Sequence, residues 1–144
     1  MTPTVHASVA ERLEGIDQRY TSNRRELVEL LAGAGRPLSI PEIRDRRTEL
    51  AQSSIYRNLA ALEQAGAVRR VTGNDDFARY ELAEELTGNH HHHLVCVRCR
   101  RITDFEVPAP YERTLEQAFH EVASSTGFRP VSHRLDLFGL CADC

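Results

Sequence analysis

Four cysteines in two closely spaced pairs are the side chains best suited to chemistry in this 144-residue chain. Cys96 and Cys99 form one C-x-x-C pair, and Cys141 and Cys144 form the other, with 41 residues between the pairs. Each C-x-x-C turn brings two thiolates within reach of one ion, and two such turns complete the tetrahedral sulfur site that zinc prefers. Because such a site has no open position, the spacing predicts a structural zinc.

A redox pair in each turn and inert buried thiols are the alternatives for these cysteines. Thioredoxin-like redox pairs lie where a strand meets a helix in a βαβ unit, and the sequence around the two pairs shows no such pattern. Disulfides are rare in cytoplasmic proteins. The sequence therefore favours zinc over both alternatives.

A run of four histidines, from His90 to His93, comes just before the first cysteine pair. In an extended segment His91 and His93 would point to one face, and His90 and His92 to the other. Each face is then a half-site that needs further oxygen or nitrogen ligands. Candidate partners are Glu81, Glu84, Glu85, Asp104, Glu112 and His133. A solvated polar loop is the alternative interpretation of the run.

The elements expected around these residues form an α+β fold in two units. Apolar spacing and end signals predict helices at 10–18, 22–34, 39–47 and from 52 or 53 to 65, then strands at 67–71 and 77–82. Asn23 and Glu26 resemble a capping box for the second helix, and Ser39 with Glu42 for the third. Helices followed by a β-hairpin predict a winged helix-turn-helix unit. His6 is expected in a mobile tail.

The second unit is expected to contain strands at 94–97 and 101–105, an amphipathic helix at 111–125 and a strand at 130–138. Leu115, Ala118, Phe119 and Val122 line the apolar face of that helix. So small a unit needs help from a metal or a second copy to bury a core. We therefore expect a DNA-binding domain at 1–84 and a metal-binding dimerisation domain at 85–144.

Composition limits the partners and the location of the protein. The chain is 41% hydrophobic, and it shows neither a signal peptide nor a run long enough to span a bilayer. We therefore expect a cytoplasmic protein without a membrane partner. The net charge is −3, and the first 82 residues carry 12 Arg and 12 acidic residues. If that part binds DNA, its Arg side chains must gather on one face, or metal must help.

Three segments of the sequence resemble the ferric uptake regulator (Fur) family. Residues 90–99, HHHHLVCVRC, look like the family's H-H-x-H-x-x-C-x-x-C core, and 133–144, HRLDLFGLCADC, look like its C-terminal block. Residues 54–59, SIYRNL, resemble the T-V-Y-R-x-L of its recognition helix. The resemblance implies a dimeric, metal-dependent DNA-binding repressor of metal-uptake or stress genes, not an enzyme and without a small-molecule substrate.

The resemblance also implies the roles of individual residues. The four cysteines would hold structural zinc; Glu81, His91, His93 and Asp104 would form a regulatory site at the hinge; and His90, His92, Glu112 and His133 would form a second site. Tyr56, Arg57, Ser54 and Arg19 would contact operator DNA, and Arg24, Arg25, Arg69 and Arg70 are further candidates. The regulatory ion would be Fe²⁺ or Zn²⁺, with Ni²⁺ and Mn²⁺ behind them.

Two departures from the family pattern affect the hinge site. Pro37 stands where many members have a histidine ligand, and three residues are inserted between Glu81 and the histidine run, which makes Glu84 and Glu85 alternative acids. Two other functions stay open: a metal buffer or zinc-stapled regulator without metal-switched DNA binding, and a zinc-dependent hydrolase. The second lacks an H-E-x-x-H motif.

Overall fold

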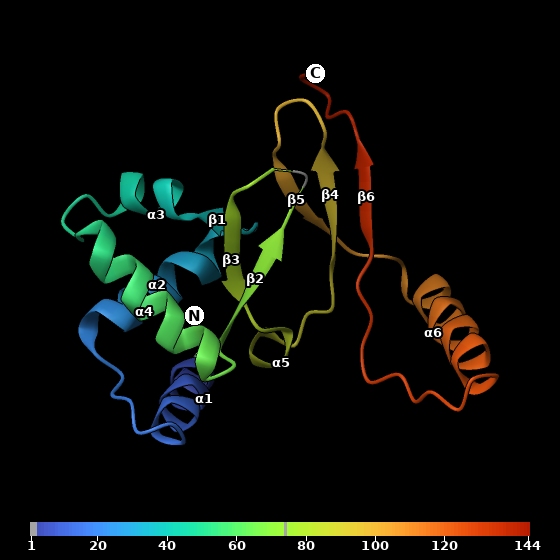
Figure 1. Cartoon of the computed structure of the whole chain (residues 1–144), viewed down its shortest axis with the longest axis horizontal. Coiled ribbons are helices and arrows are strands. Elements are labelled where there is room, and N and C mark those ends of the chain that lie inside the picture. Colours follow the sequence, from blue (N-terminus) through green and yellow to red (C-terminus); the bar gives the residue numbers. More distant parts are fainter. Residues whose placement is uncertain (1–2, 74) are drawn as a thin grey trace.

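The computed structural model describes residues 3–73 and 75–144, which form two lobes, each with a three-stranded sheet (Figure 1). The first lobe contains α1 (Pro3–Glu14), α2 (Ser22–Ala34), β1 (Leu38–Ser39), α3 (Ile40–Arg46), α4 (Gln52–Gln64), β2 (Val68–Thr72) and β3 (Ala78–Leu82). After α5 (Glu84–Thr87), the second contains β4 (His92–Cys96), β5 (Ile102–Phe105), α6 (Ala109–Ser124) and β6 (Asp136–Gly139). The α+β winged-helix layout is confirmed, with a third strand, β1, that was not expected.

Local end signals explain where the helices of the first lobe begin. Ser39 Oγ accepts a hydrogen bond from the Glu42 backbone N–H, and the Glu42 carboxylate accepts one from the Ser39 N–H at 2.8 Å, so this capping box is confirmed. The capping box expected at Asn23 is wrong, because Thr21 caps α2 through the Arg24 N–H. Gly35, with a φ of 67°, ends α2.

The start of the chain differs from the expectation. The first helix begins at Pro3 and ends at Glu14, and Val9 and Leu13 pack fully buried in the core. His6 therefore lies in α1 rather than in a tail, and its Nδ1 is 2.7 Å from the hydroxyl oxygen of Tyr20. This places His6 among the residues that hold α1 against the loop before α2, away from the histidine run.

An apolar core fills the space between the helices and the first sheet. Ile55, Leu59 and Leu62 follow helical spacing along α4 and are at most 1% exposed. Leu27 and Leu31 of α2 pack into the same core. One side of α4 is therefore fixed against the core, and its opposite face is left for solvent or a ligand.

The second lobe has β4 at the centre of its sheet. Strand β5 pairs with β4 in antiparallel fashion, and β6 pairs with β4 in parallel, with Cys96 opposite Gly139. The strand expected at 130–138 is wrong for its first half, because only Asp136–Gly139 is a strand and Val131 is 98% exposed. This short strand still brings the C-terminal cysteines beside the end of β4.

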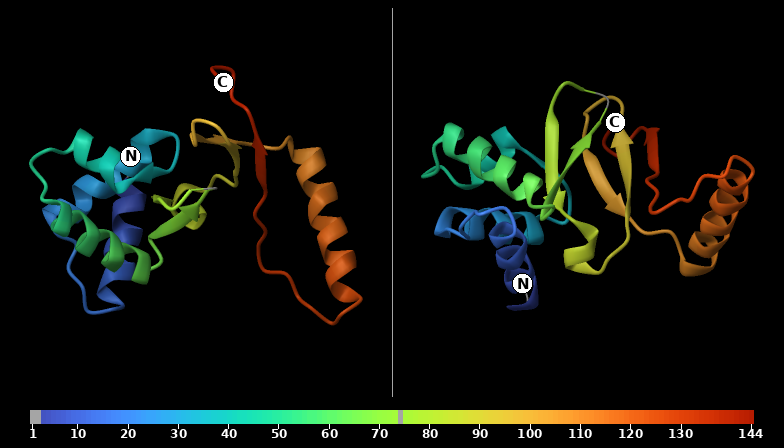
Figure 2. Two further views of the ribbon diagram at one scale, coloured as in Figure 1. Left: turned by 45° about the horizontal axis from the view of Figure 1, so that its top comes forward. Right: turned by 60° about the horizontal axis from the view of Figure 1, so that its bottom comes forward.

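Helix α6 lies apart from both sheets (Figures 1 and 2). It contains no buried residue, and Val122 on its apolar face is 72% exposed. Pro110 occupies the first turn of α6, where proline needs no hydrogen-bond partner. The apolar face of α6 is thus uncovered in a single chain. No helix in the described ranges is long and apolar enough to cross a membrane.

Candidate metal centres and nucleic-acid interface

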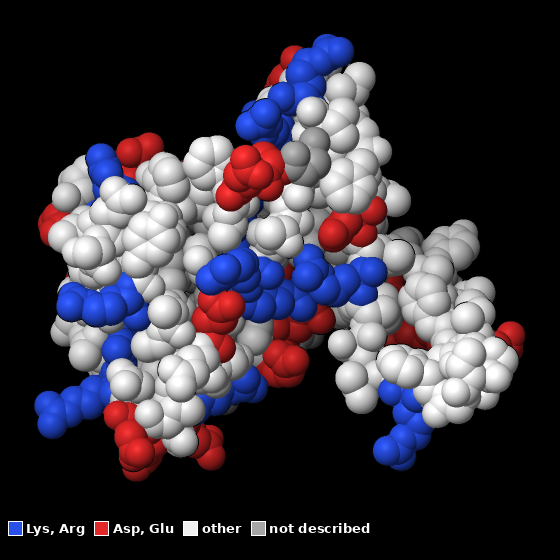
Figure 3. Space-filling view, in the orientation of Figure 1, with Lys and Arg blue, Asp and Glu red and all other residues white. Residues whose placement is uncertain are grey.

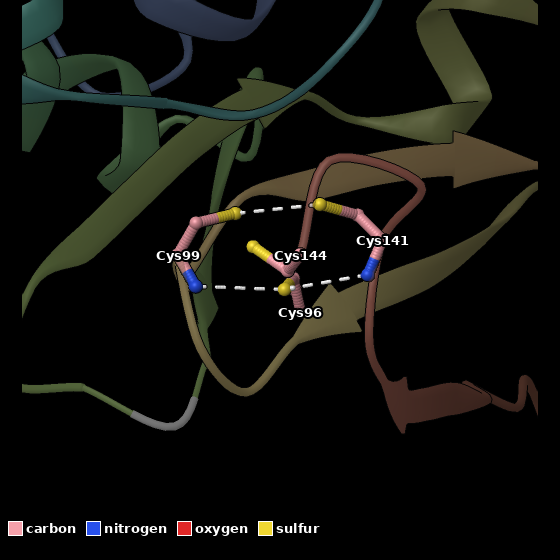
Figure 4. A group of neighbouring side chains, drawn as sticks. All are labelled: Cys96, Cys99, Cys141 and Cys144. Carbon is pink, nitrogen blue, oxygen red and sulfur yellow. Dashed lines mark hydrogen bonds between the residues drawn. The ribbon is translucent and has the colours of Figure 1, made fainter.

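The four cysteine side chains converge at the tip of the second lobe (Figure 4). The Cys96–Cys99 turn follows β4, and the Cys141–Cys144 turn follows β6, so the parallel pairing of these strands places the two turns side by side. Cys99 Sγ lies 3.7 Å from Cys141 Sγ, and all four sulfurs lie within 4.8 Å of one another. In a tetrahedral zinc site with Zn–S bonds of about 2.3 Å, the sulfurs are about 3.8 Å apart. The arrangement fits a zinc ion.

Backbone amides prepare one of these sulfurs for ligation. The N–H groups of Cys141 and Cys99 both point at Cys96 Sγ, with N–S distances of 3.4 and 3.5 Å. These hydrogen bonds lower the pKa of Cys96 to about 5, which favours the thiolate that a metal binds. Hydrogen bonding with Cys141 raises the pKa of Cys144 to about 12. Without a cation, the formation of a second thiolate in this cluster is therefore unfavourable.

A second group of ligand atoms joins the two sheets. Glu81 of β3, His91 just before β4, His93 of β4 and Asp104 of β5 have ligand atoms within 4.8 Å of one another, and we name them the inter-sheet cluster. His91 Nε2 is 2.9 Å and His93 Nε2 is 3.2 Å from the Glu81 carboxylate. Only Glu81 comes from the first lobe, so an ion here would connect that lobe to the second.

The charges of the inter-sheet cluster fit a cation. Burial alone would raise the pKa of Glu81, but hydrogen bonds with His93 and His91 lower it to about 2, which keeps the carboxylate ionised. Asp104 Oδ1 is buried without a hydrogen-bond partner among the described residues, and burial raises the pKa of this carboxyl group. An orphaned, buried oxygen beside two imidazoles is a position that a metal ion satisfies.

Four further residues form a group against α6. His90, His92 of β4, Glu112 of α6 and His133 have ligand atoms within 4.8 Å of one another, and we name them the α6 cluster. His90 Nε2 and His92 Nε2 lie 2.9 and 3.0 Å from different oxygens of Glu112, and His133 Nε2 also contacts that carboxylate. Three imidazole nitrogens around one carboxylate form a mixed nitrogen and oxygen donor set that suits zinc, iron or manganese.

The structure shows which of the three candidate acids lies at the expected hinge site, and what surrounds Pro37, which stands where many family members have a histidine ligand. Glu81 faces His91 and His93, whereas Glu85 is exposed and Glu84 contacts His90. Near Pro37, the end of α2 contributes Gly35 and Arg36 but no ligand, and a hollow of about 170 Å³ separates them from Glu81, His91 and Asp104. The first lobe thus supplies a single carboxylate ligand to the inter-sheet cluster.

Two contacts near the clusters were not expected from the sequence. Asp136 Oδ1 lies 3.4 Å from His93 Nδ1, on the side of the ring that faces away from Glu81. Arg69, expected at a phosphate, instead pairs with Glu81 at 2.8 Å. Asp136 lies opposite His93 in the β4–β6 pairing, and this register could not be predicted from the sequence.

The outer face of α4 is open for contact with a ligand. Tyr56 is 53% exposed, Arg57 and Arg19 are exposed, and Ser54 is half-buried and accepts a hydrogen bond from Asn58. Arg24, another expected DNA contact, is occupied: it donates to Asn58, to Gln18 and to the Arg19 carbonyl. Blue and red patches alternate over the visible surface, so the basic side chains do not form one continuous face there (Figure 3).

Comparisons with known proteins agree with this geometry. The ferric uptake regulation protein of Neisseria meningitidis is 38% identical over 96 residues, which cover 67% of this chain and 61% of that protein. The peroxide operon regulator of Bacillus subtilis is 25% identical over 138 residues, covering 93% and 89%. The Helicobacter pylori ferric uptake regulator, whose structure reveals three functional metal-binding sites, has a TM-score of 0.75 at 28% identity, covering 100% and 97%. The sequence profile described as the ferric uptake regulator family matches residues 16–138, and the chain belongs to that family.

Proposed function

We propose that the protein is a metal-dependent DNA-binding transcriptional repressor that acts as a homodimer on operator DNA in the cytoplasm. The observation that carries the proposal is the inter-sheet cluster, which draws Glu81 from the lobe with the recognition helix and its other ligands from the second lobe. The proposal divides the chain into a DNA-binding domain at 1–84 and a dimerisation domain at 85–144. It gives the clusters structural or regulatory roles and no catalytic one.

The three clusters have different proposed roles. The cysteine cluster would hold a structural zinc, because its four sulfurs leave no position open for a substrate or a water. The inter-sheet cluster would hold the regulatory ion, Fe²⁺ or Zn²⁺ before Ni²⁺ or Mn²⁺, and the α6 cluster would hold another divalent ion. When bound, such ions would supply positive charge that offsets the carboxylates and would fix the imidazoles by coordination.

The chain's own residues explain how the inter-sheet cluster would affect DNA binding. Glu81 is only 5% exposed and lies in β3, which pairs with β2 along the wing. Holding Glu81 against His91 and His93 therefore fixes the wing and α4 relative to the second lobe, which carries the dimer contacts. A ligand that fits only one arrangement of the lobes raises the population of that arrangement.

DNA recognition is proposed for the exposed side of α4. Tyr56 would contact a thymine methyl group and Arg57 a guanine edge in the major groove, with Ser54 beside them and Arg19 at a phosphate. Two copies of the chain, joined through α6 and β6, would place two such helices on two half-sites. The exposed apolar residues Val122, Leu137 and Phe138 support that mode of association.

The proposal is tested by fluorescence anisotropy on duplexes enriched from a random pool by the protein with each metal. We expect Zn²⁺ or Fe²⁺, added anaerobically to zinc-stapled protein, to raise DNA affinity at least tenfold. Glu81→Gln should abolish that gain, and Glu106→Gln, a change at an exposed acid, should retain it. Equal DNA affinity of the protein with and without the added metal would contradict the proposal and leave the zinc with a structural role alone.

A further inference from the structure

Arg69 and Glu84 connect the inter-sheet cluster to the α6 cluster. Glu81 Oε1 accepts a hydrogen bond from Arg69 Nε at 2.8 Å, and Arg69 Nη2 donates to Glu84 Oε1 at 3.2 Å. The other oxygen of Glu84 lies 3.0 Å from His90 Nδ1, and His90 Nε2 lies 2.9 Å from Glu112. Five side chains thus form a continuous hydrogen-bonded path from one cluster to the other.

At the first end of this path, Arg69 fixes the carboxylate of Glu81. Arg69 Nε donates to Oε1, while Oε2 lies 2.9 Å from His91 Nε2, and His93 Nε2 lies 3.2 Å from both oxygens. A guanidinium keeps its charge at every pH that proteins tolerate, and its planar fork fixes the direction of each hydrogen bond. The position of Arg69 therefore determines how the Glu81 carboxylate faces the two imidazoles of the cluster.

At the other end, Glu84 contacts the histidine run at two adjacent residues. Its Oε1 accepts a hydrogen bond from the backbone N–H of His91 at 3.2 Å, and its Oε2 meets the His90 ring. Glu84 lies in α5, the short helix between β3 and the histidine run. The neighbouring Glu85 is exposed and makes no hydrogen bond or ion pair with the described residues. Of these two neighbouring acids, Glu84 is the one that takes part in the path.

We propose that the Arg69–Glu84 pair couples the two clusters, so that an ion in the α6 cluster tightens binding of an ion in the inter-sheet cluster. This inference rests on the proposed metal sites. A neutral imidazole that gives Nε2 to an ion carries its proton on Nδ1, and His90 then donates that proton to Glu84. Glu84 is thereby held against Arg69, and Arg69 holds Glu81 in its ligand geometry. Linkage requires the same effect in the opposite direction.

Arg69 and Glu84 are positioning residues in this scheme, because neither offers an atom to an ion. Their side chains are 28% and 22% exposed, so the pair is partly shielded, but as an isolated ion pair it would contribute little to stability. Its expected effect is on metal affinity: loss of an outer hydrogen-bond partner of a ligand lowers affinity by roughly 10–100-fold. Unfolding measurements alone would therefore miss it.

The test is a cobalt(II) titration of zinc-stapled, full-length protein against a competing chelator, followed by visible absorption. His133→Ala removes one ligand of the α6 cluster; His133 contacts His90 and Glu112 at the far end of the path but none of Glu84, Arg69 and Glu81. In the chain with Glu84, we expect this change to raise the Kd of the inter-sheet cluster about tenfold. In Glu84→Gln that Kd should already be raised about tenfold, and adding His133→Ala should raise it no further. Glu85→Gln is the matched control and should behave as the unchanged chain.

A second variant keeps the test decisive if Glu84→Gln folds poorly. Arg69→Lys retains the charge beside Glu81 but loses the fork that reaches Glu84, so it should also remove the dependence on His133. An equal effect of His133→Ala with and without Glu84 overturns the inference, as does an α6 cluster that binds no cobalt. Both results overturn the coupling and leave metal-dependent DNA binding unaffected. If instead the coupling is observed but metal does not change DNA affinity, the proposed function is overturned and the coupling stands.

Discussion

The two lobes of this protein are stabilised by different interactions. The first buries a continuous apolar core, in which residues such as Leu27, Ile55 and Leu62 are 0% exposed. In the second, α6 has no buried residue, whereas His92 and His93 are 1% and 2% exposed. The interior of the second lobe is thus largely made of side chains of types that can bind metals. We therefore expect its fold to depend on ligation and association, while the first lobe relies on hydrophobic burial.

The magnitudes of these effects support the contrast. A fully buried Leu or Ile contributes roughly 1.5–3 kcal/mol through the hydrophobic effect, and the first lobe has many of them. A structural zinc contributes an apparent free energy of about 10–16 kcal/mol in small zinc domains. Among the described residues, the apolar cluster of the second lobe is small: Val95 and Ile102 pack against Val71 of the wing. The zinc would therefore be the largest stabilising contribution to this lobe.

The largest expected effect comes from removing one cysteine ligand. Cys141→Ser should release the zinc and expose the amides of 92–105 and 136–144 to rapid hydrogen exchange, because β4 and β6 are joined at the cysteine cluster. Helices α2 and α4 should keep their protection. Elemental analysis and hydrogen–deuterium exchange measure both effects, with Ala142→Ser as a control in the same turn. Equal loss of protection in both lobes would contradict the contrast.

A pair of leucine truncations would sharpen the comparison. Leu62→Ala removes a fully buried side chain of the first lobe and should cost about 2–5 kcal/mol of unfolding free energy. Leu137→Ala in β6 removes one that is 56% exposed in a single chain. We expect it to change monomer stability by less than about 0.5 kcal/mol and to weaken the dimer instead. Urea unfolding and sedimentation at several concentrations separate the two, and a stable dimer in Leu137→Ala would argue against β6 as the contact.

The first lobe was predictable because its signals are local. The helix at Ser22–Ala34 has the predicted bounds, and Ser39 with Glu42 forms the predicted capping box. Apolar spacing in α4 identified the buried side of the recognition helix. The wrong predictions in this lobe also concern local patterns. Helix α1 spans Pro3–Glu14 instead of 10–18, and β1, with two residues, is too short to leave a pattern in the sequence.

The second lobe was predictable only in part, since its structure depends on long-range contacts. Spacing alone identified the cysteine pairs, but the assignment of Glu112 and His133 came from the family resemblance. The apolar alternation at 130–138 predicted a strand, yet in the described structure only Asp136–Gly139 forms a strand that pairs with β4. Glu84 and Asp136 acquire their contacts through strand register and through α5, which no local pattern determines.

One contact joins the two lobes at the wing and depends on a carboxylate. The Asp75 side chain is 1% exposed, and its Oδ1 and Oδ2 accept hydrogen bonds from Arg79 Nη1 at 2.9 Å and Nη2 at 2.8 Å. Arg79 Nη2 also donates to the carbonyl oxygen of Arg100 at 3.1 Å. Arg100 follows Cys99, so the wing is anchored to the cysteine turn. Hydrogen bonding to Arg79 lowers the pKa of Asp75 below its ordinary value of 3.8.

The smallest expected effect is a pH-dependent loss of this contact. Because the folded-state pKa of Asp75 is lowered, its stabilisation is complete above the unfolded value near 3.8 and disappears as pH falls through the folded value. Asp75→Asn should therefore cost about 1 kcal/mol, a typical net hydrogen-bond contribution, at pH 7 and equally at pH 5, and the difference from the unchanged chain should shrink only below about pH 4. Urea unfolding at each pH measures that difference, and metal loss in acid cancels from it because both chains share the clusters. Asp76→Asn, at the exposed neighbour, should cost nothing at any pH. A cost for Asp75→Asn that already declines between pH 7 and pH 5 would show that the wing is not anchored through an ionised Asp75, and the two lobes would then be linked by the inter-sheet cluster and the small apolar contact alone.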